Sequence, residues 1–339
     1  MLKDKCIAGN MSLHNRVVAA PVVSNSADED GLPTPRSLEI YRGYAESGAG
    51  MTVVEQHAVH PWGRNKLNQF RLYDDASALA LEPLTALFRQ RDIPVVAQLN
   101  FAGAGASSET LLACQDFKLV SPSGLRTPRD LIKHDSQALQ HDEITSIVQA
   151  FADAAGRAVT LAKYSGGVQI YACHGYLIGQ FLSPMTNRRS DAYGGALENR
   201  ARLLFEIVEA VKAVIGGHPL SVRLGAADQM PGAPEVGLTL ADSVWVAEQL
   251  AKMRVDWLSV SGNHCIYGIG ADDNDTAYFA PYSKAIRDSV AKYGVLVDCT
   301  GGIRTAQRAQ ALLNSEICDL VGVARPLIKD KTFLFSWDL

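Results

Sequence analysis

Residues 167–173 read GVQIYAC, an almost continuously apolar run that is followed by a histidine and a glycine. A run without alternating apolar and polar residues is typical of a parallel strand that is buried on both faces. Seven runs of the same kind flank it. Three precede it, RVVAAPV at 16–22, MTVVEQH at 51–57 and PVVAQL at 94–99, and four follow it, PLSVRL at 219–224, VDWLSVS at 255–261, GVLVDC at 294–299 and CDLVGVA at 318–324.

Helical periodicity fills the gaps between these runs. In RARLLFEIVEAVKAVI (200–215), apolar residues recur at spacings of three and four, and 242–253 and 306–313 follow the same pattern. Eight buried strands that alternate with helices predict an α/β fold, a single (β/α)8 TIM barrel that takes in residues 1–339 as one domain. The competing open, doubly wound sheet predicts a Gly-x-Gly-x-x-Gly turn after the first strand, and the sequence has none there.

The charge pattern narrows the classes of partner. The 32 basic and 36 acidic residues are well mixed, and no basic stripe or polybasic run favours nucleic acid or an anionic membrane. No apolar stretch approaches the roughly 18 residues of a membrane span, and MLKDKC at the start lacks a signal-peptide core. The six cysteines are scattered, so we expect reduced thiols and neither a metal nor an iron–sulfur site. We therefore expect a cytoplasmic protein that acts on a small-molecule substrate, and homo-oligomerisation stays open.

Polar residues and glycines stand where successive apolar runs stop. Because the carboxyl ends of barrel strands meet at one mouth, these residues predict a ring of site residues there. A Gly-Gly pair lets backbone N–H groups approach an anion, and an arginine guanidinium can donate two hydrogen bonds to the same anion. The loops after the last two strands are the usual phosphate site of such barrels. The residues of the predicted ring are Gln56, His57, Gln98, His174, Tyr176, Arg223, Ser261, Gly301, Gly302 and Arg325.

The segment YACHGYLIGQFLSPMTNRRSDAYGGALENR, residues 171–200, closely resembles the signature of the Old Yellow Enzyme family. The resemblance extends over nearly the whole chain. It includes LHNRVVAAPVV near the start, VVEQHAVHPWGR, VAQLN, SPSG at 121–124, SVRLG, TGGI and ARPLIKD near the end. It implies an FMN-dependent barrel enzyme that takes NADH or NADPH as co-substrate and reduces an activated C=C bond.

The resemblance also implies roles for particular residues. Ala20, Pro21, Val22 and Gln56 would lie beside the flavin, Gln98 would bind its pyrimidine end, and Arg223 would lie near ring N1. Gly301, Gly302, Ala324 and Arg325 would hold the phosphate. His174, paired with Tyr171, would bind the substrate carbonyl, and Tyr176 would donate a proton. Arg188, Arg189, Asp191 and Arg200 are expected to fix a loop.

Tyr171 departs from the common family pattern, which has a histidine there. Tyr-x-x-His and the Ala-Arg-Pro at 324–326 are similar to the trimethylamine dehydrogenase branch. That similarity keeps a second function open, in which an FMN-dependent dehydrogenase oxidises N-methyl amines and passes electrons to a separate acceptor. The branch uses an aspartate after the sixth strand, and the nearest candidate here is Asn263. A flavin-bearing barrel without turnover is the alternative from another class of protein.

Overall fold

The computed structural model describes residues 1–114, 117–125, 135–229, 236–262 and 275–339, and a closed barrel of parallel strands lies at its centre. The strands follow chain order around the barrel, and the last pairs with the first to close it. They are β3 (Val17–Ala19), β4 (Met51–Ala58), β5 (Val95–Asn100), β8 (Val168–Ala172), β9 (Leu220–Gly225), β10 (Trp257–Ser261), β11 (Leu296–Thr300) and β12 (Leu320–Val323). Each strand falls on one of the eight predicted runs, so the predicted TIM barrel is confirmed.

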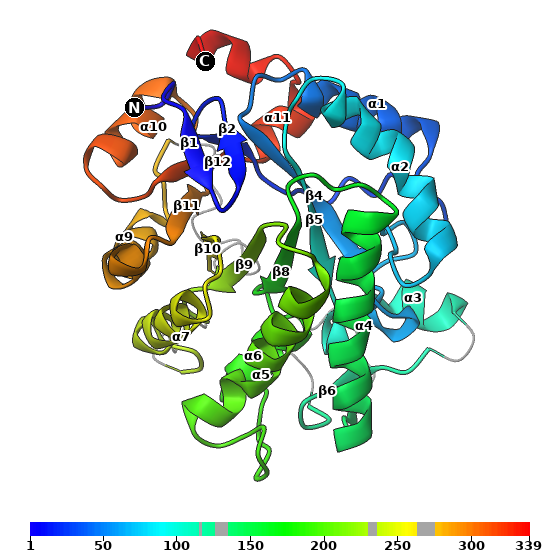
Figure 1. Cartoon of the computed structure of the whole chain (residues 1–339). Coiled ribbons are helices and arrows are strands. Elements are labelled where there is room, and N and C mark those ends of the chain that lie inside the picture. The colour runs from blue at the N-terminus through cyan, green and yellow to red at the C-terminus, as the bar shows by residue number, and fades with distance from the viewer. Residues whose placement is uncertain (115–116, 126–134, 230–235, 263–274) are drawn as a thin grey trace.

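Helices surround the strands (Figure 1). Asp74, Thr239 and Thr305 cap three of them, since each side chain accepts a hydrogen bond from a backbone N–H in the first turn. The helix predicted from Arg200 begins three residues earlier, at Leu197. The apolar pattern did not reveal this first turn, because the turn adds only one half-buried leucine to the core. The helices are α1 (Pro35–Ala45), α2 (Asp75–Arg89), α3 (Ser108–Ala113), α4 (His141–Thr160), α5 (Leu177–Leu182), α6 (Leu197–Val214), α7 (Leu240–Lys252), α9 (Ala280–Val290), α10 (Ala306–Asn314) and α11 (Arg325–Lys329).

A hairpin that the sequence analysis did not predict closes the amino-terminal end of the barrel. Its strands, β1 (Cys6–Ala8) and β2 (Met11–Leu13), pair antiparallel. Met11 and Leu13 pack in one buried cluster with Met51 and Trp257 from the barrel strands. The two chain ends lie on the same side of the molecule (Figure 1), where Lys3 Nζ lies 2.5 Å from Asp338 Oδ2. The carboxyl end of the barrel lies opposite the hairpin.

Two long connections cover that carboxyl end. The connection after β5 carries a 3-10 turn (Gly103–Gly105), α3 and the short strands β6 (Val120–Ser121) and β7 (Gln137–Ala138), and the connection after β8 carries α5. The two connections touch, since Leu177 N–H donates to Phe101 O at 3.0 Å. Arg189 and Asp191 form an ion pair, and Arg200 Nε donates to Leu182 O at 2.8 Å, so both arginines fix the second connection.

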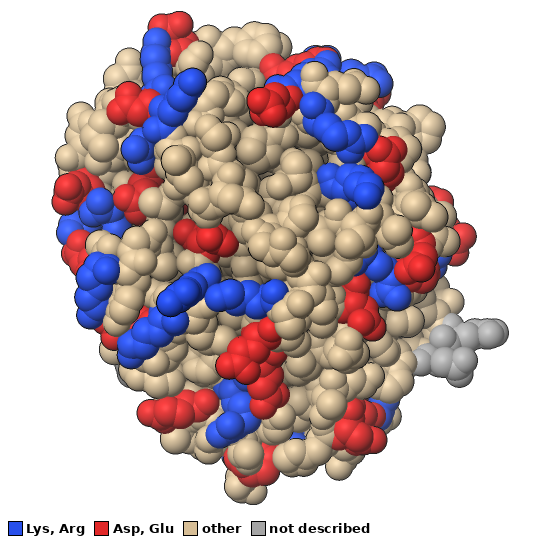
Figure 2. Space-filling view, viewed as in Figure 1, with Lys and Arg blue, Asp and Glu red and all other residues tan. Residues whose placement is uncertain are grey.

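The surface carries interspersed charges. On the face drawn in Figure 2, lysines and arginines alternate with aspartates and glutamates. Within the described part of the chain, no helix is long and apolar enough to cross a membrane. The cytoplasmic location, the homo-oligomeric state and the assignment of all 339 residues to one domain stay predictions.

Candidate functional site

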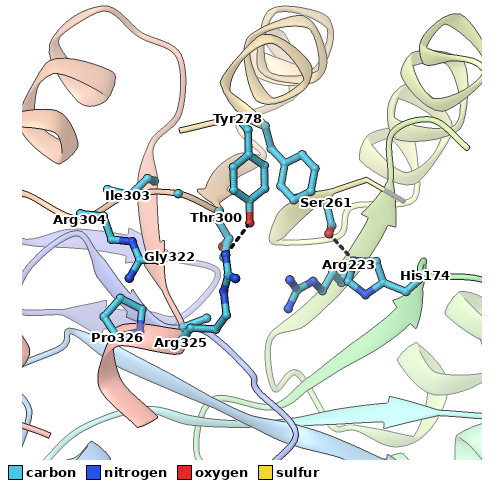
Figure 3. A pocket seen from close by; sticks show the side chains of 14 residues that line it. His174, Arg223, Ser261, Tyr278, Thr300, Ile303, Arg304, Gly322, Arg325 and Pro326 are labelled. Atoms are coloured by element: carbon cyan, nitrogen blue, oxygen red, sulfur yellow. Dashed lines mark hydrogen bonds between the residues drawn. The ribbon is translucent and has the colours of Figure 1, made fainter. Parts of the chain in front are cut away.

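A cavity at the carboxyl end of the barrel brings together residues from five successive strand ends (Figure 3). Seven residues predicted from the sequence line it: His174, Arg223, Ser261, Gly301, Gly302, Ala324 and Arg325. The Arg223 side chain points into the cavity from one side, and Arg325 lies opposite (Figure 3). Ser261 and Thr300, at the ends of β10 and β11, complete the wall between them.

The part of the cavity beside β11 and β12 has the chemistry of an anion site. Gly301 and Gly302 have φ values of +114° and +67°, a region that L residues with side chains rarely adopt. Arg304 and Arg325 line the same part of the cavity. Arg325 Nη2 donates to Tyr278 Oη at 3.3 Å, and the Tyr278 ring lies against both glycines. Two guanidinium groups beside left-handed glycines form a donor set that fits a phosphate.

A tight turn after β8 positions the predicted catalytic side chains. His174 and Gly175 have φ values of +55° and +69°, and Tyr176 N–H donates to Cys173 O at 3.3 Å. A non-glycine residue in the left-handed region costs on the order of 1–3 kcal/mol, and such residues cluster at functional sites. The turn brings three rings together, because the Tyr171 ring centroid lies 5.5 Å from that of His174 and 5.4 Å from that of Tyr176.

Tyr171, His174 and Ser261 form a chain of hydrogen bonds. The Tyr171 hydroxyl bonds to His174 Nδ1, and His174 Nε2 lies 2.6 Å from Ser261 Oγ. From the sequence, His174 was expected to bind the substrate carbonyl together with Tyr171. In the structure the phenol contacts the imidazole itself, and Nε2 is the nitrogen on the side of the Ser261 hydroxyl. Tyr171 therefore fixes the orientation of the histidine ring.

The Tyr176 hydroxyl lies in a buried network of amides. Asn65 Nδ2 donates to Tyr176 Oη at 2.7 Å, and Gln56 Nε2 approaches it at 3.5 Å. Asn100 Nδ2 in turn donates to Gln56 Oε1 at 2.7 Å. Gln56 was predicted to lie beside the flavin, and the structure adds this contact with Tyr176. Sequence reasoning missed Asn65, because a single polar residue after HPWGR carries no signal of its own.

The remaining predicted residues lie outside the cavity of Figure 3. Gln98 is buried and donates from Nε2 to Gln169 Oε1 at 2.8 Å. Ala20 is buried, and its backbone N–H donates to Val323 O at 2.9 Å. Pro21 and Val22 are half-buried and lie beyond the end of β3. Asn263 lies outside the described residues.

His57 has a structural role. It is fully buried, and its Nε2 lies 2.8 Å from Tyr164 Oη. Burial lowers the pKa of His57 to about 4, so the ring is neutral at physiological pH.

Comparison with known proteins identifies the family. Residues 7–337 match the NADH:flavin oxidoreductase / NADH oxidase family. An NADPH dehydrogenase from Bacillus licheniformis is 34% identical over 330 residues, which are 94% of this chain and 88% of the relative. An Old Yellow Enzyme homologue from Zymomonas mobilis superposes with a TM-score of 0.82 at 26% identity, over 97% of this chain and 90% of that one. Histamine dehydrogenase from Rhizobium sp. 4-9 has a TM-score of 0.84 at 21% identity, over 99% of this chain and 47% of that one, and shows the shared fold alone.

The chain belongs to the NADH:flavin oxidoreductase / NADH oxidase family. It is an FMN-dependent NAD(P)H oxidoreductase of the Old Yellow Enzyme type. The predicted family, the FMN cofactor and the nicotinamide co-substrate are thereby confirmed. The particular similarity to the trimethylamine dehydrogenase branch stays a prediction.

Proposed function

We propose that this protein reduces the C=C bond of an α,β-unsaturated carbonyl compound with NADPH or NADH. The observation that carries the proposal is the turn at Cys173–Tyr176, which sets His174 and Tyr176 at the carboxyl end of β8, with His174 lining the same cavity as Arg223. A histidine and a tyrosine so arranged can bind a carbonyl oxygen and supply a proton to the neighbouring carbon.

FMN, when bound, supplies the hydride chemistry by accepting hydride from the nicotinamide and passing it to the substrate. The donor set at Gly301, Gly302 and Arg325 would hold its phosphate, and Ala324 belongs to the same wall. Arg223 would lie at the electron-rich side of the ring. Ala20, Pro21, Val22, Gln56 and Gln98 would line the remaining side of the ring, as the family resemblance implies.

His174 would hold the substrate carbonyl oxygen. We assign the donor role in the Tyr171–His174 bond to the phenol, which places the imidazole proton on Nε2. The substrate carbonyl oxygen would replace Ser261 Oγ as the partner of that N–H, and negative charge develops on this oxygen during hydride transfer. Tyr171 acts through His174, so we assign it a positioning role.

Tyr176 would supply the proton to the α-carbon. Its oxygen accepts a hydrogen bond from Asn65, and this contact does not use the phenolic proton, which Tyr176 would transfer. The same amide donor would stabilise the phenolate that remains after the transfer. The buried position of Tyr176 favours this interaction, since hydrogen bonds strengthen where water is excluded.

Oxidation of N-methyl amines is the weaker alternative. An amine mechanism of the kind considered from the sequence anchors a protonated histidine with a carboxylate. Here Nε2 of His174 lies 2.6 Å from a serine hydroxyl, Ser261 Oγ. The nearest candidate in the sequence for the aspartate of that branch is Asn263, and an amide has no negative charge to stabilise an imidazolium.

Isotope transfer tests the proposed reaction. NADPH carrying deuterium at the transferable position of the nicotinamide is incubated anaerobically with the holoprotein and an acyclic enone. We expect the saturated product to carry that deuterium on its β-carbon and a solvent hydrogen on its α-carbon, read by mass spectrometry and NMR. Failure to form a saturated product from a panel of enones and dienoyl thioesters would contradict the proposal.

A further inference from the structure

A buried carboxylate lies in the barrel beneath the cavity, in the row of residues that contains Arg223. In the pairing register, Ser259 of β10 stands opposite both Arg223 of β9 and Asp298 of β11. Side chains at paired positions project to the same face of the sheet, so these three residues form one layer of the barrel. Asp298 is 2% exposed and Arg223 is 6% exposed.

Hydrogen bonds fix the Asp298 carboxylate in this layer. Ser259 Oγ donates to Asp298 Oδ1 at 3.0 Å, and Thr300 Oγ1 donates to the same oxygen at 3.1 Å. Thr300 itself lines the cavity. The carboxylate is therefore bonded to a residue of the cavity wall, and the side chains that hold it come from β10 and β11.

We propose that Asp298 is an electrostatic positioning residue that offsets the positive charge of Arg223 and thereby sets how strongly the protein stabilises an anionic flavin ring. Arg223 points its guanidinium into the cavity (Figure 3), and the Asp298 carboxylate lies within Coulombic range of that group. A buried negative charge beside a cation lowers the potential that the cation creates at a nearby ligand. The inference rests on FMN binding at this cavity and is independent of which substrate the flavin reduces.

The test uses the holoprotein and sulfite. Sulfite sulfur forms a reversible bond to N5 of oxidised flavin with its own electron pair, and the ring becomes an anion. Asp298→Asn removes the negative charge of the carboxylate and leaves the positive charge of Arg223. We therefore expect sulfite to bind about tenfold more tightly. The same tenfold factor corresponds to a rise of about 30 mV in the two-electron flavin potential, measured by spectroelectrochemistry.

The matched control is Asp256→Asn. Asp256 lies just before β10, at the other end of the barrel, and its Oδ2 accepts from Leu220 N–H at 2.7 Å. This carboxylate-to-amide change is expected to leave the sulfite Kd and the flavin potential unchanged. Asp298→Ser is the second neutral variant, for use where the asparagine variant does not fold.

The pH dependence provides an independent arm of the test. Burial raises the pKa of Asp298 to about 6, and the attraction of Arg223 and the hydrogen bonds of Ser259 and Thr300 oppose the rise. The Cys318 thiol, which lies just before β12, is also within Coulombic range of this carboxylate. Asp298 is thus ionised at pH 8 and largely protonated at pH 5. The wild-type sulfite Kd divided by the Asp298→Asn sulfite Kd should therefore fall toward 1 as the pH is lowered from 8 to 5. Protonation of sulfite affects both Kd values equally, so it does not change this ratio.

Two results would overturn the inference. Asp298→Asn could lower the Tm while its sulfite Kd and potential stay within twofold of wild type, which would assign the residue to barrel stability alone. A ratio of Kd values that is the same at pH 5 and pH 8 would also contradict it. A protein that does not bind FMN would instead contradict the proposed function.

Discussion

Replacing Tyr176 with phenylalanine is expected to slow flavin reoxidation by an enone while leaving flavin reduction by NADPH within about a factor of three of wild type. Positioned proton donors typically contribute about 100- to 10,000-fold to a reaction rate, and we expect a loss in that range. The loss is confined to one half-reaction because the nicotinamide gives hydride without needing a proton. The measurement is stopped-flow absorbance of the flavin, with each half-reaction followed separately.

Tyr193→Phe is the control for this prediction. Tyr193 is half-buried and lies in the connection between α5 and α6, and its hydroxyl donates to Glu206 at 2.9 Å. The substitution removes a tyrosine hydroxyl, as Tyr176→Phe does, but at a place away from the proposed site. Both half-reactions should keep their wild-type rates in this variant. Equal losses in the two half-reactions of Tyr176→Phe would show that Tyr176 shapes the flavin site and is not the proton donor.

Replacing Gly301 with valine is expected to weaken FMN binding by roughly 100-fold, as two lost charge-assisted hydrogen bonds would do. A Cβ at this position would lie 2.6 Å from the Tyr278 ring, and φ is +114°. A β-branched residue in that conformation is strained, so the backbone must move away from the phosphate position. Titration of the apoprotein with FMN and with riboflavin measures the effect. Riboflavin lacks the phosphate, so its affinity should change little.

Gly294→Val is the matched control, since Gly294 also has a positive φ, +75°, and precedes the same strand, β11, at its other end. Nothing lies within 4 Å of a Cβ there. This variant should lose stability from backbone strain and keep its preference for FMN over riboflavin. If Gly301→Val retained the wild-type FMN affinity, the phosphate would bind elsewhere.

The barrel could be predicted from the sequence because each buried strand needs a continuous apolar run, and eight such runs are separated by helical periodicity. The hairpin at Cys6–Leu13 could not, since its three-residue strands are too short to produce a period. For the site, the polar residues at the strand ends predicted His174, Tyr176 and Arg325, and the family resemblance supplied their roles. It did not reveal the contact between Tyr171 and His174, because that contact depends on the left-handed turn at His174.

Two further residues of the site escaped sequence reasoning for a physical reason. Asn65 reaches Tyr176 across 111 positions of the chain, and no local pattern encodes a contact at that separation. Asp298 did leave a signal, as a charged residue inside the apolar run GVLVDC. A buried charge in a strand requires partners, and only the register with Ser259 and Arg223 identifies them.

The most direct test of the account is an anaerobic stopped-flow experiment on the wild-type holoprotein. The oxidised flavin is mixed in turn with NADPH, NADH and an N-methyl amine, and the reduced flavin is then mixed with an enone. We predict that a nicotinamide bleaches the flavin, that the enone restores its colour, and that the amine leaves the flavin oxidised. Bleaching by the amine, with neither nicotinamide reacting, would contradict the account and assign the protein to amine oxidation.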